Sequence, residues 1–162
     1  CAVLSGDLSA AIGRQREMCI ICRIITVLVS VTGFSSDDWT TGFVVITELV
    51  ANDCSAVAVD LASNAEPGDL AGLLGQIDLI RIDFPSFADG RGFTIAAQLR
   101  RMGFVGRLRA RGAVIADQYA MARRSGFDEV EISDDLATRQ PEPQWLARAD
   151  WQAHDYQARL RG

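Results

Sequence analysis

The chain has 162 residues, 49% of them hydrophobic, and a formal net charge of −5 at pH 7. That length suits one compact domain with a buried core and is too short for two. The acidic balance excludes broad binding to nucleic acid or to anionic membrane surfaces, which needs clustered basic side chains, so we expect small molecules and proteins as partners.

Two residue types that often carry catalysis are scarce. The sequence contains no lysine, so all 16 basic residues are arginine, and its one histidine is His154. This composition excludes Schiff-base and Walker-type lysines and a zinc helix with two histidines, and we expect no metal site. Arginine does not act as a base at ordinary pH, but it binds carboxylate, sulfate or phosphate through two parallel hydrogen bonds. The composition therefore favours anion binding over proton transfer.

Residues 1–32 form an N-terminal extension that the sequence does not explain. Within it, the apolar run from Cys19 to Val31 predicts a buried strand, or is upstream sequence outside the native domain. Cys19 and Cys22 have the C-x-x-C spacing of redox motifs, but they lie inside this apolar run, so ordinary buried thiols compete with a redox or metal role. At about 13 residues, with Arg23 inside it, the run is shorter than the roughly 20 residues needed to cross a bilayer. With four cysteines and no secretory pattern, a reducing cytoplasm is the expected compartment.

From residue 33 onward, short β-branched runs alternate with helical segments and glycine-rich turns. The strands are predicted at residues 56–61, 78–84, 107–111 and 128–132, with a further short strand or extended lead-in at 44–50. The helices are predicted as a short one from residue 66, then at 92–102 and 114–125.

This alternation predicts an α/β core domain over residues 33–140. Its sheet is expected to be mostly parallel and four-stranded with helical crossovers, as an open sheet or a half-barrel. A linker at residues 140–143 then leads into a C-terminal tail, residues 141–162, which is expected to pack on the core.

One face of the predicted sheet is charged. Because side chains alternate along a strand, one face collects Arg81, Asp83, Arg107, Arg109, Arg111, Glu129 and Glu131. If the strands are adjacent in chain order, the arginines lie between acids and form cross-strand pairs. Two interpretations stay open, an ion-pair network on a solvated sheet and a ligand pocket built on it. The face lies open, is covered by the terminal segments, or meets a second copy in a homo-oligomer.

The segment 84–93 reads FPSFADGRGF and joins a strand to a helix, which is where α/β proteins usually bind ligands. Its glycines let a ligand approach the backbone, the helix start offers free N–H groups, and Arg91 adds a planar anion binder. The residues expected to hold a small oxyanion are Gly90, Arg91, Gly92, Arg111, Asp117, Gln118 and Glu131. The alternative is a tight turn in which Asp89 caps the helix and Arg91 pairs with an acid.

Several motifs, taken in order, resemble one bacterial family. They are FPxFxDGRGFT at residues 84–94, Leu99 with Arg100, the segment 106–114, Asp117 with Gln118, and RxGFD at 124–128 with Glu131. Together they are similar to the family catalogued as domain of unknown function 934, over about residues 36–160. Ala113 departs from the pattern, which has an acid after the glycine.

The resemblance implies a cytoplasmic protein of assimilatory sulfur metabolism, because members of that family are described as probable oxidoreductases linked to sulfite reduction. The first function it allows is a non-catalytic accessory protein that recognises sulfite-reducing enzymes or a small sulfur oxyanion through Arg91 and Arg109. The second is an oxidoreductase or other enzyme in which Asp83 or Asp89 works with Arg109 on a small anionic sulfur-containing substrate. No dinucleotide or flavin motif is evident in the sequence, so no cofactor is expected.

Overall fold

The computed structural model describes residues 26–45 and 57–152. The cysteines considered for a redox role, Cys1, Cys19, Cys22 and Cys54, lie outside these residues, and so does His154.

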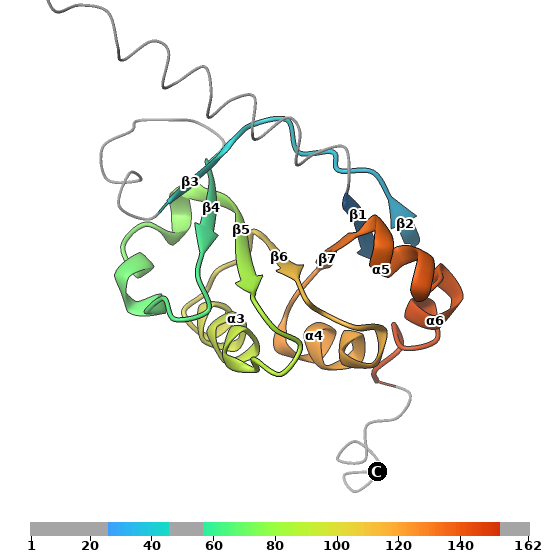
Figure 1. Ribbon diagram of the computed structural model, residues 1–162. Coiled ribbons are helices and arrows are strands. Elements are labelled where there is room, and N and C mark those ends of the chain that lie inside the picture. Colours follow the sequence, from blue (N-terminus) through green and yellow to red (C-terminus); the bar gives the residue numbers. More distant parts are fainter. Residues whose placement is uncertain (1–25, 46–56, 153–162) are drawn as a thin grey trace, which may run out of the picture.

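The described strands form one sheet in the order β2-β1-β7-β6-β5-β4-β3 (Figure 1). Their bounds are β1 Thr26–Ser30, β2 Gly33–Ser35, β3 Phe43–Val45, β4 Val57–Leu61, β5 Ile77–Phe84, β6 Arg107–Gly112 and β7 Glu129–Ser133. Strands β3 to β7 are parallel to one another, whereas β1 pairs antiparallel with both β7 and β2. The α/β class and the mostly parallel sheet are therefore confirmed.

The predicted count of four strands is wrong, because the described part of the sheet has seven. Strands β4 to β7 match the four predicted strands to within one residue at each end. The further strands are β1, β2 and β3. Strand β3 overlaps the short strand or extended lead-in predicted at 44–50, of which residues 46–50 lie outside the described part of the chain. Strand β2 has only three residues, too few for an alternating pattern to be recognised. Strand β1 lies within the apolar run from Cys19 to Val31, for which a buried strand was one of the two predicted alternatives, and it pairs with β7.

The helices follow the prediction in the middle of the chain and depart from it at the end. Their bounds are α3 Arg91–Arg101, α4 Tyr119–Ser125, α5 Asp134–Arg139 and α6 Glu142–Leu146, with short 3-10 turns η1 Pro67–Leu70, η2 Leu74–Gln76 and η3 Ala116–Gln118. Helix α5 was not predicted, although Ser133 caps it by accepting a hydrogen bond from the Leu136 amide. The predicted linker at 140–143 instead starts α6, with Pro141 as its N-cap.

Helices α3 and α4 lie together on one face of the sheet (Figure 1). The strand residues packed on this side are apolar and at most 2% exposed: Ile80, Ile82, Phe84, Leu108, Ala110, Val130 and Ile132. The ring of Phe84 lies 4.9 Å from that of Phe93 in α3. Because the other face of these strands carries the charged side chains, the helices bury one face only.

The charged face is crossed by residues 36–42, which we call the crossing segment. It connects β2 at one edge of the sheet to β3 at the other, on the side away from α3 and α4 (Figure 1). Within it, Asp37 accepts a hydrogen bond from Arg109 at 3.0 Å, and Asp38 accepts two from Arg107. These contacts lie toward the amino ends of the parallel strands, so the crossing segment covers that part of the charged face.

Candidate functional site

Charged side chains form two rows across the face opposite the helices. The strand register places Asp60, Arg81, Arg109 and Glu129 side by side in the first row, and Asp83, Arg111 and Glu131 in the second. The predicted charged face is therefore present, and its second row lies nearer the carboxyl ends of the strands.

The first row is an ion-pair network that also reaches Glu131 of the second row. Arg81 donates to both carboxylate oxygens of Asp60, at 2.5 and 2.6 Å. Arg109 donates to Glu129 at 2.8 Å as well as to Asp37 in the crossing segment. Burial alone would lower the pKa of Arg109, but the hydrogen bond to Asp37 and the charge of Glu129 raise it above its usual value. The guanidinium therefore stays charged, and its partners within the fold hold it.

Arg109 was expected to contact a ligand, and the structure places it inside this network. Its side chain is 0% exposed, and Asp37 and Glu129, which it contacts, are only 8% exposed. A buried ion pair of this kind is costly to break, because the remaining carboxylates would lose their partner. The geometry gives Arg109 the role of holding the crossing segment against the sheet.

The glycine-rich turn agrees in part with the tight-turn alternative. Arg91 pairs with an acid, Asp89, whereas the N-cap of α3 is Gly90, which makes no side-chain capping hydrogen bond. Asp89 accepts hydrogen bonds from Arg91 at its backbone N, at Nε and at Nη2, over 3.1, 2.9 and 2.7 Å. These hydrogen bonds hold the pKa of the Asp89 carboxyl well below its usual value. Arg91 also donates to the hydroxyl of Ser63, at 3.3 Å. Asp89 thus occupies the Nε and Nη2 edge of this guanidinium.

The two glycines of this turn differ in their surroundings. A Cβ on Gly92 would overlap the ring of Phe84, so this glycine allows α3 to pack closely on β5. A Cβ on Gly90 would meet nothing within 4 Å. Gly92 therefore serves helix packing, and Gly90 has no comparable constraint.

Asp117 and Gln118 also have partners within the protein. Asp117 is 74% exposed and forms an ion pair of 3.0 Å with Arg148. Gln118 donates from Nε2 to the carbonyl of Phe87 at 2.6 Å, and its Oε1 accepts from the amide of Ile115 at 3.3 Å. Gln118 therefore fixes the loop after β5 to the start of the η3–α4 segment.

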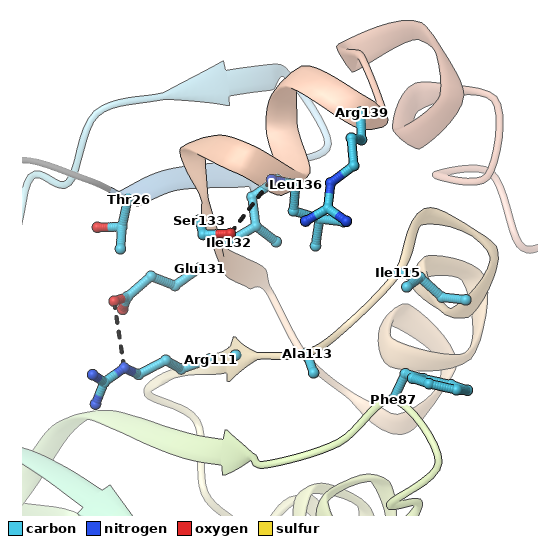
Figure 2. A pocket seen from close by; sticks show the side chains of 11 residues that line it. Thr26, Phe87, Arg111, Ala113, Ile115, Glu131, Ile132, Ser133, Leu136 and Arg139 are labelled. Atoms are coloured by element: carbon cyan, nitrogen blue, oxygen red, sulfur yellow. Dashed lines mark hydrogen bonds and ion pairs between the residues drawn. The ribbon is translucent and has the colours of Figure 1, made fainter.

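A pocket of about 430 Å³ lies at the carboxyl ends of β6 and β7 (Figure 2). We call it the carboxyl-edge pocket. Its lining residues are Thr26, Phe87, Arg111, Gly112, Ala113, Ile115, Glu131, Ile132, Ser133, Leu136 and Arg139. Of the predicted site residues, the structure brings Arg111 and Glu131 to this pocket. Asp83 is an exposed register neighbour of Arg111, whereas Asp89, Gly90, Arg91 and Gly92 do not line it.

The charges of the carboxyl-edge pocket are only partly paired. Nε of Arg111 lies 3.8 Å from Oε1 of Glu131, and the Arg111 side chain is 39% exposed. Glu131 also accepts a hydrogen bond from Arg81 at 3.2 Å. Arg139 extends from α5 toward the pocket (Figure 2), and its only described hydrogen bond is from Nε to the carbonyl of Asp135. Within residues 26–45 and 57–152, no carboxylate pairs with Arg139, so the pocket has free guanidinium donors.

Sequence reasoning missed Arg139 and Phe87. Arg139 is in the last turn of a six-residue helix that was not predicted. The available signal was the sequence Ser133-Asp134-Asp135, a capping residue followed by two acids, which is typical of a helix start. Phe87 was part of the recognised motif, but only the fold shows that its side chain lies at the pocket (Figure 2).

Two general properties can be stated for the same described residues. They contain no helix with the length and apolar character required to cross a membrane. They also contain no cluster of three or more His, Cys, Asp or Glu side chains arranged to hold a metal ion.

The fold and this pocket define the chain as an α/β protein with a mostly parallel sheet and a pocket at the carboxyl ends of its strands. The family described as "Bacterial protein of unknown function (DUF934)" matches residues 58–162, well over half of the chain. The protein belongs to this family. A comparison of the sequence with curated proteins found no match.

Proposed function

We propose that this protein is a non-catalytic binding protein that takes an anion into the carboxyl-edge pocket. The observation that carries the proposal is the contrast between its arginines. Three arginines are each hydrogen-bonded to a carboxylate: Arg81, Arg91 and Arg109. Two others, Arg111 and Arg139, line the pocket and make no such hydrogen bond among the described residues. A guanidinium that faces a pocket is suited to bind an oxyanion through two N–H groups.

The position of the pocket supports the same proposal. Ligands of open α/β sheets bind beyond the carboxyl ends of the parallel strands, where the connecting loops meet. Here the pocket combines the ends of β6 and β7 with Phe87 from the loop after β5. Gly112 has a positive φ of 106°, and a Cβ there would lie 2.5 Å from the carbonyl of Phe84, so glycine permits the tight exit from β6.

The cellular role that we propose is an accessory function in assimilatory sulfur metabolism, in the cytoplasm and beside the sulfite-reducing enzymes. Its support is the motif resemblance described above. Deleting the gene in its bacterial host tests this role. We expect slow growth on sulfate that is restored by sulfide or by cysteine. Unchanged growth on sulfate would contradict the role, and rescue by cysteine but not by sulfide would move it downstream of reduction.

Binding itself is tested by calorimetric titration with sulfite, methanesulfonate and naphthalene-1-sulfonate. We expect at least one of these anions to bind, and Arg139→Gln and Arg111→Gln to weaken that binding about tenfold each. Arg101→Gln is the matched control, because Arg101 is an exposed arginine of α3 that does not line the pocket. Absence of binding by all three anions, or equal binding by all variants, would overturn the proposal.

An enzyme is the second candidate, because exposed Asp83 is in register beside Arg111. Both residues lie in the second row, where a carboxylate could reach a ligand held by Arg111. The discriminating experiment compares wild type with Asp83→Asn. Consumption of sulfite or of a sulfated nucleotide that this substitution abolishes would replace the binding function with a catalytic one.

A further inference from the structure

We infer that the ligand of the carboxyl-edge pocket is an organic monoanion with an apolar body, and not an inorganic oxyanion. This inference rests on the proposed function, because it takes the pocket as the binding site. Three properties of the pocket lead to it: its size, its lining and its charge.

The pocket is too large for an inorganic oxyanion alone. Its volume is about 430 Å³, whereas a water molecule takes up roughly 30 Å³ in the liquid. Sulfite or sulfate, on the order of two to three waters in size, would fill only a minor part of it. Pockets of roughly 300 to 1,000 Å³ are typical of organic ligands. The remaining space therefore needs either several waters or the body of a larger molecule.

The lining distinguishes between water and an organic body. The apolar side chains on the pocket are Phe87, Ala113, Ile115, Ile132 and Leu136. Phe87 is 62% exposed, so a ligand can cover much of its ring. Its backbone carbonyl is held by Gln118, so the ring is carried by an anchored loop. An anchored, exposed ring beside aliphatic side chains gains free energy when an apolar group covers it, and ordered water provides no such gain.

The charged groups fix the other end of the ligand. Arg111 and Arg139 carry two positive charges, and Glu131 carries one negative charge, so the lining has one positive charge in excess. In Figure 2, Arg111 and Glu131 lie on one side of the pocket, Arg139 extends from α5, and Phe87 and Ile115 lie away from the Glu131 carboxylate. A molecule with one anionic group and an apolar remainder matches this division. Sulfonates, sulfate monoesters and carboxylates share that chemistry.

The test compares four probes by calorimetry on the whole chain: sulfite, methanesulfonate, naphthalene-1-sulfonate and neutral naphthalene-1-sulfonamide. We expect naphthalene-1-sulfonate to bind roughly tenfold or more tightly than methanesulfonate, because of the apolar area that it buries. Removing its charge, as in the sulfonamide, should lower the affinity by a similar factor.

Two variants locate the two ends of the ligand. Phe87→Ala should weaken the binding of naphthalene-1-sulfonate about fivefold to tenfold and leave the binding of methanesulfonate unchanged. Arg139→Gln should weaken the binding of both sulfonates. Val105→Ala is the control, since Val105 is 93% exposed and does not line the pocket.

The outcomes separate this inference from the proposed function. If sulfite binds as tightly as naphthalene-1-sulfonate and Arg139→Gln weakens the binding of sulfite, the anion-binding function stands and the organic ligand is excluded. If no probe binds, or if the Phe87→Ala and Arg139→Gln variants bind naphthalene-1-sulfonate as tightly as wild type, the organic-ligand inference and the anion-binding function are both overturned.

Discussion

Nη1 of Arg109 lies 3.5 Å from Oε2 of Glu131, although the two residues belong to different rows of the charged face. Nη1 makes no hydrogen bond among the described residues, so its attraction to Glu131 is coulombic. The same guanidinium bonds Glu129 and Asp37. One buried cation thus contacts carboxylates from both rows and from the crossing segment.

The first prediction concerns this buried cation. Replacing Arg109 with methionine should reduce the free energy of unfolding by about 3 to 5 kcal/mol, because the buried carboxylates of Asp37, Glu129 and Glu131 would each lose a cationic partner. Urea unfolding followed by circular dichroism measures the change. Arg101→Met, at an exposed position, should stay within about 0.5 kcal/mol of wild type. A loss below about 1 kcal/mol for Arg109→Met would show that the network does not stabilise the fold.

The second prediction concerns the detachment of the crossing segment from the sheet at low pH. Hydrogen bonds from Arg107 are the largest influence that holds the pKa of Asp38 below its usual value. The folded pKa is thus lower than the unfolded one, so the Asp38 contribution to stability is complete above the unfolded value, about pH 4, and is lost as the pH falls through the folded value. We expect the fluorescence of neighbouring Trp39, isolated by subtracting the Trp39→Phe variant, to change below about pH 4 before the far-ultraviolet circular dichroism does.

In Asp38→Asn, this acid change in Trp39 emission should be absent or much smaller. Trp39 emission that stays constant down to the pH of global unfolding, in the wild type, would contradict the role of Asp38 in holding the segment.

The third prediction separates the two glycines of the FPSFADGRGF turn. Gly92→Ala should destabilise the protein by about 1 to 3 kcal/mol, because its Cβ would press on the ring of Phe84 in a packed core. Gly90→Ala is the matched control and should change stability by less than about 1 kcal/mol, because its φ of −84° suits alanine and nothing lies near. Thermal and urea unfolding measure both variants. Equal effects would mean that close packing at Gly92 is not what the glycine provides.

The fourth prediction concerns the anchored loop that carries Phe87. Gln118→Met keeps the side-chain size but removes the hydrogen bonds to Phe87 and Ile115. Chymotrypsin should then cleave after Phe87 several-fold faster than in wild type, because the backbone opens more often. Mass spectrometry identifies the new fragment beginning at Ala88. Gln98→Met, an exposed glutamine of α3, is the control and should leave the rate unchanged.

The central part of the fold could be predicted from the sequence. Strands β4 to β7 and helix α3 have strong periodic patterns of five residues or more, and the alternation of Arg81 and Asp83 with Ile80 and Ile82 already separates the two faces of β5. The edge strands β2 and β3 were harder to predict, since a three-residue strand shows no periodic pattern. Strand β1, which lies between β2 and β7, depends for its pairing on a partner distant in the chain, since Val27 pairs with Ile132.

The site was harder to predict for a physical reason. A sequence shows which arginines exist but not which are already paired. The sequence left open whether Arg91 binds an anion or pairs with an acid, and in the fold Asp89, two residues before it, bonds its guanidinium. Arg139 had no motif around it, and its role depends on how α5 lies over the end of β7 (Figure 2). Pairing is a property of three-dimensional register, so the free donors became identifiable only with the fold.

The central claim is that the free anion-binding groups lie at the carboxyl-edge pocket and not at the glycine-rich turn. A titration of the ¹⁵N-labelled protein with naphthalene-1-sulfonate, followed by two-dimensional amide spectra, tests it most directly. The account predicts that the amide signals of Ala113, Ile115 and Ser133 shift with a single affinity while those of Gly90 and Gly92 stay in place. Shifts at Gly90 and Gly92 with no change at Ala113, Ile115 and Ser133 would contradict it.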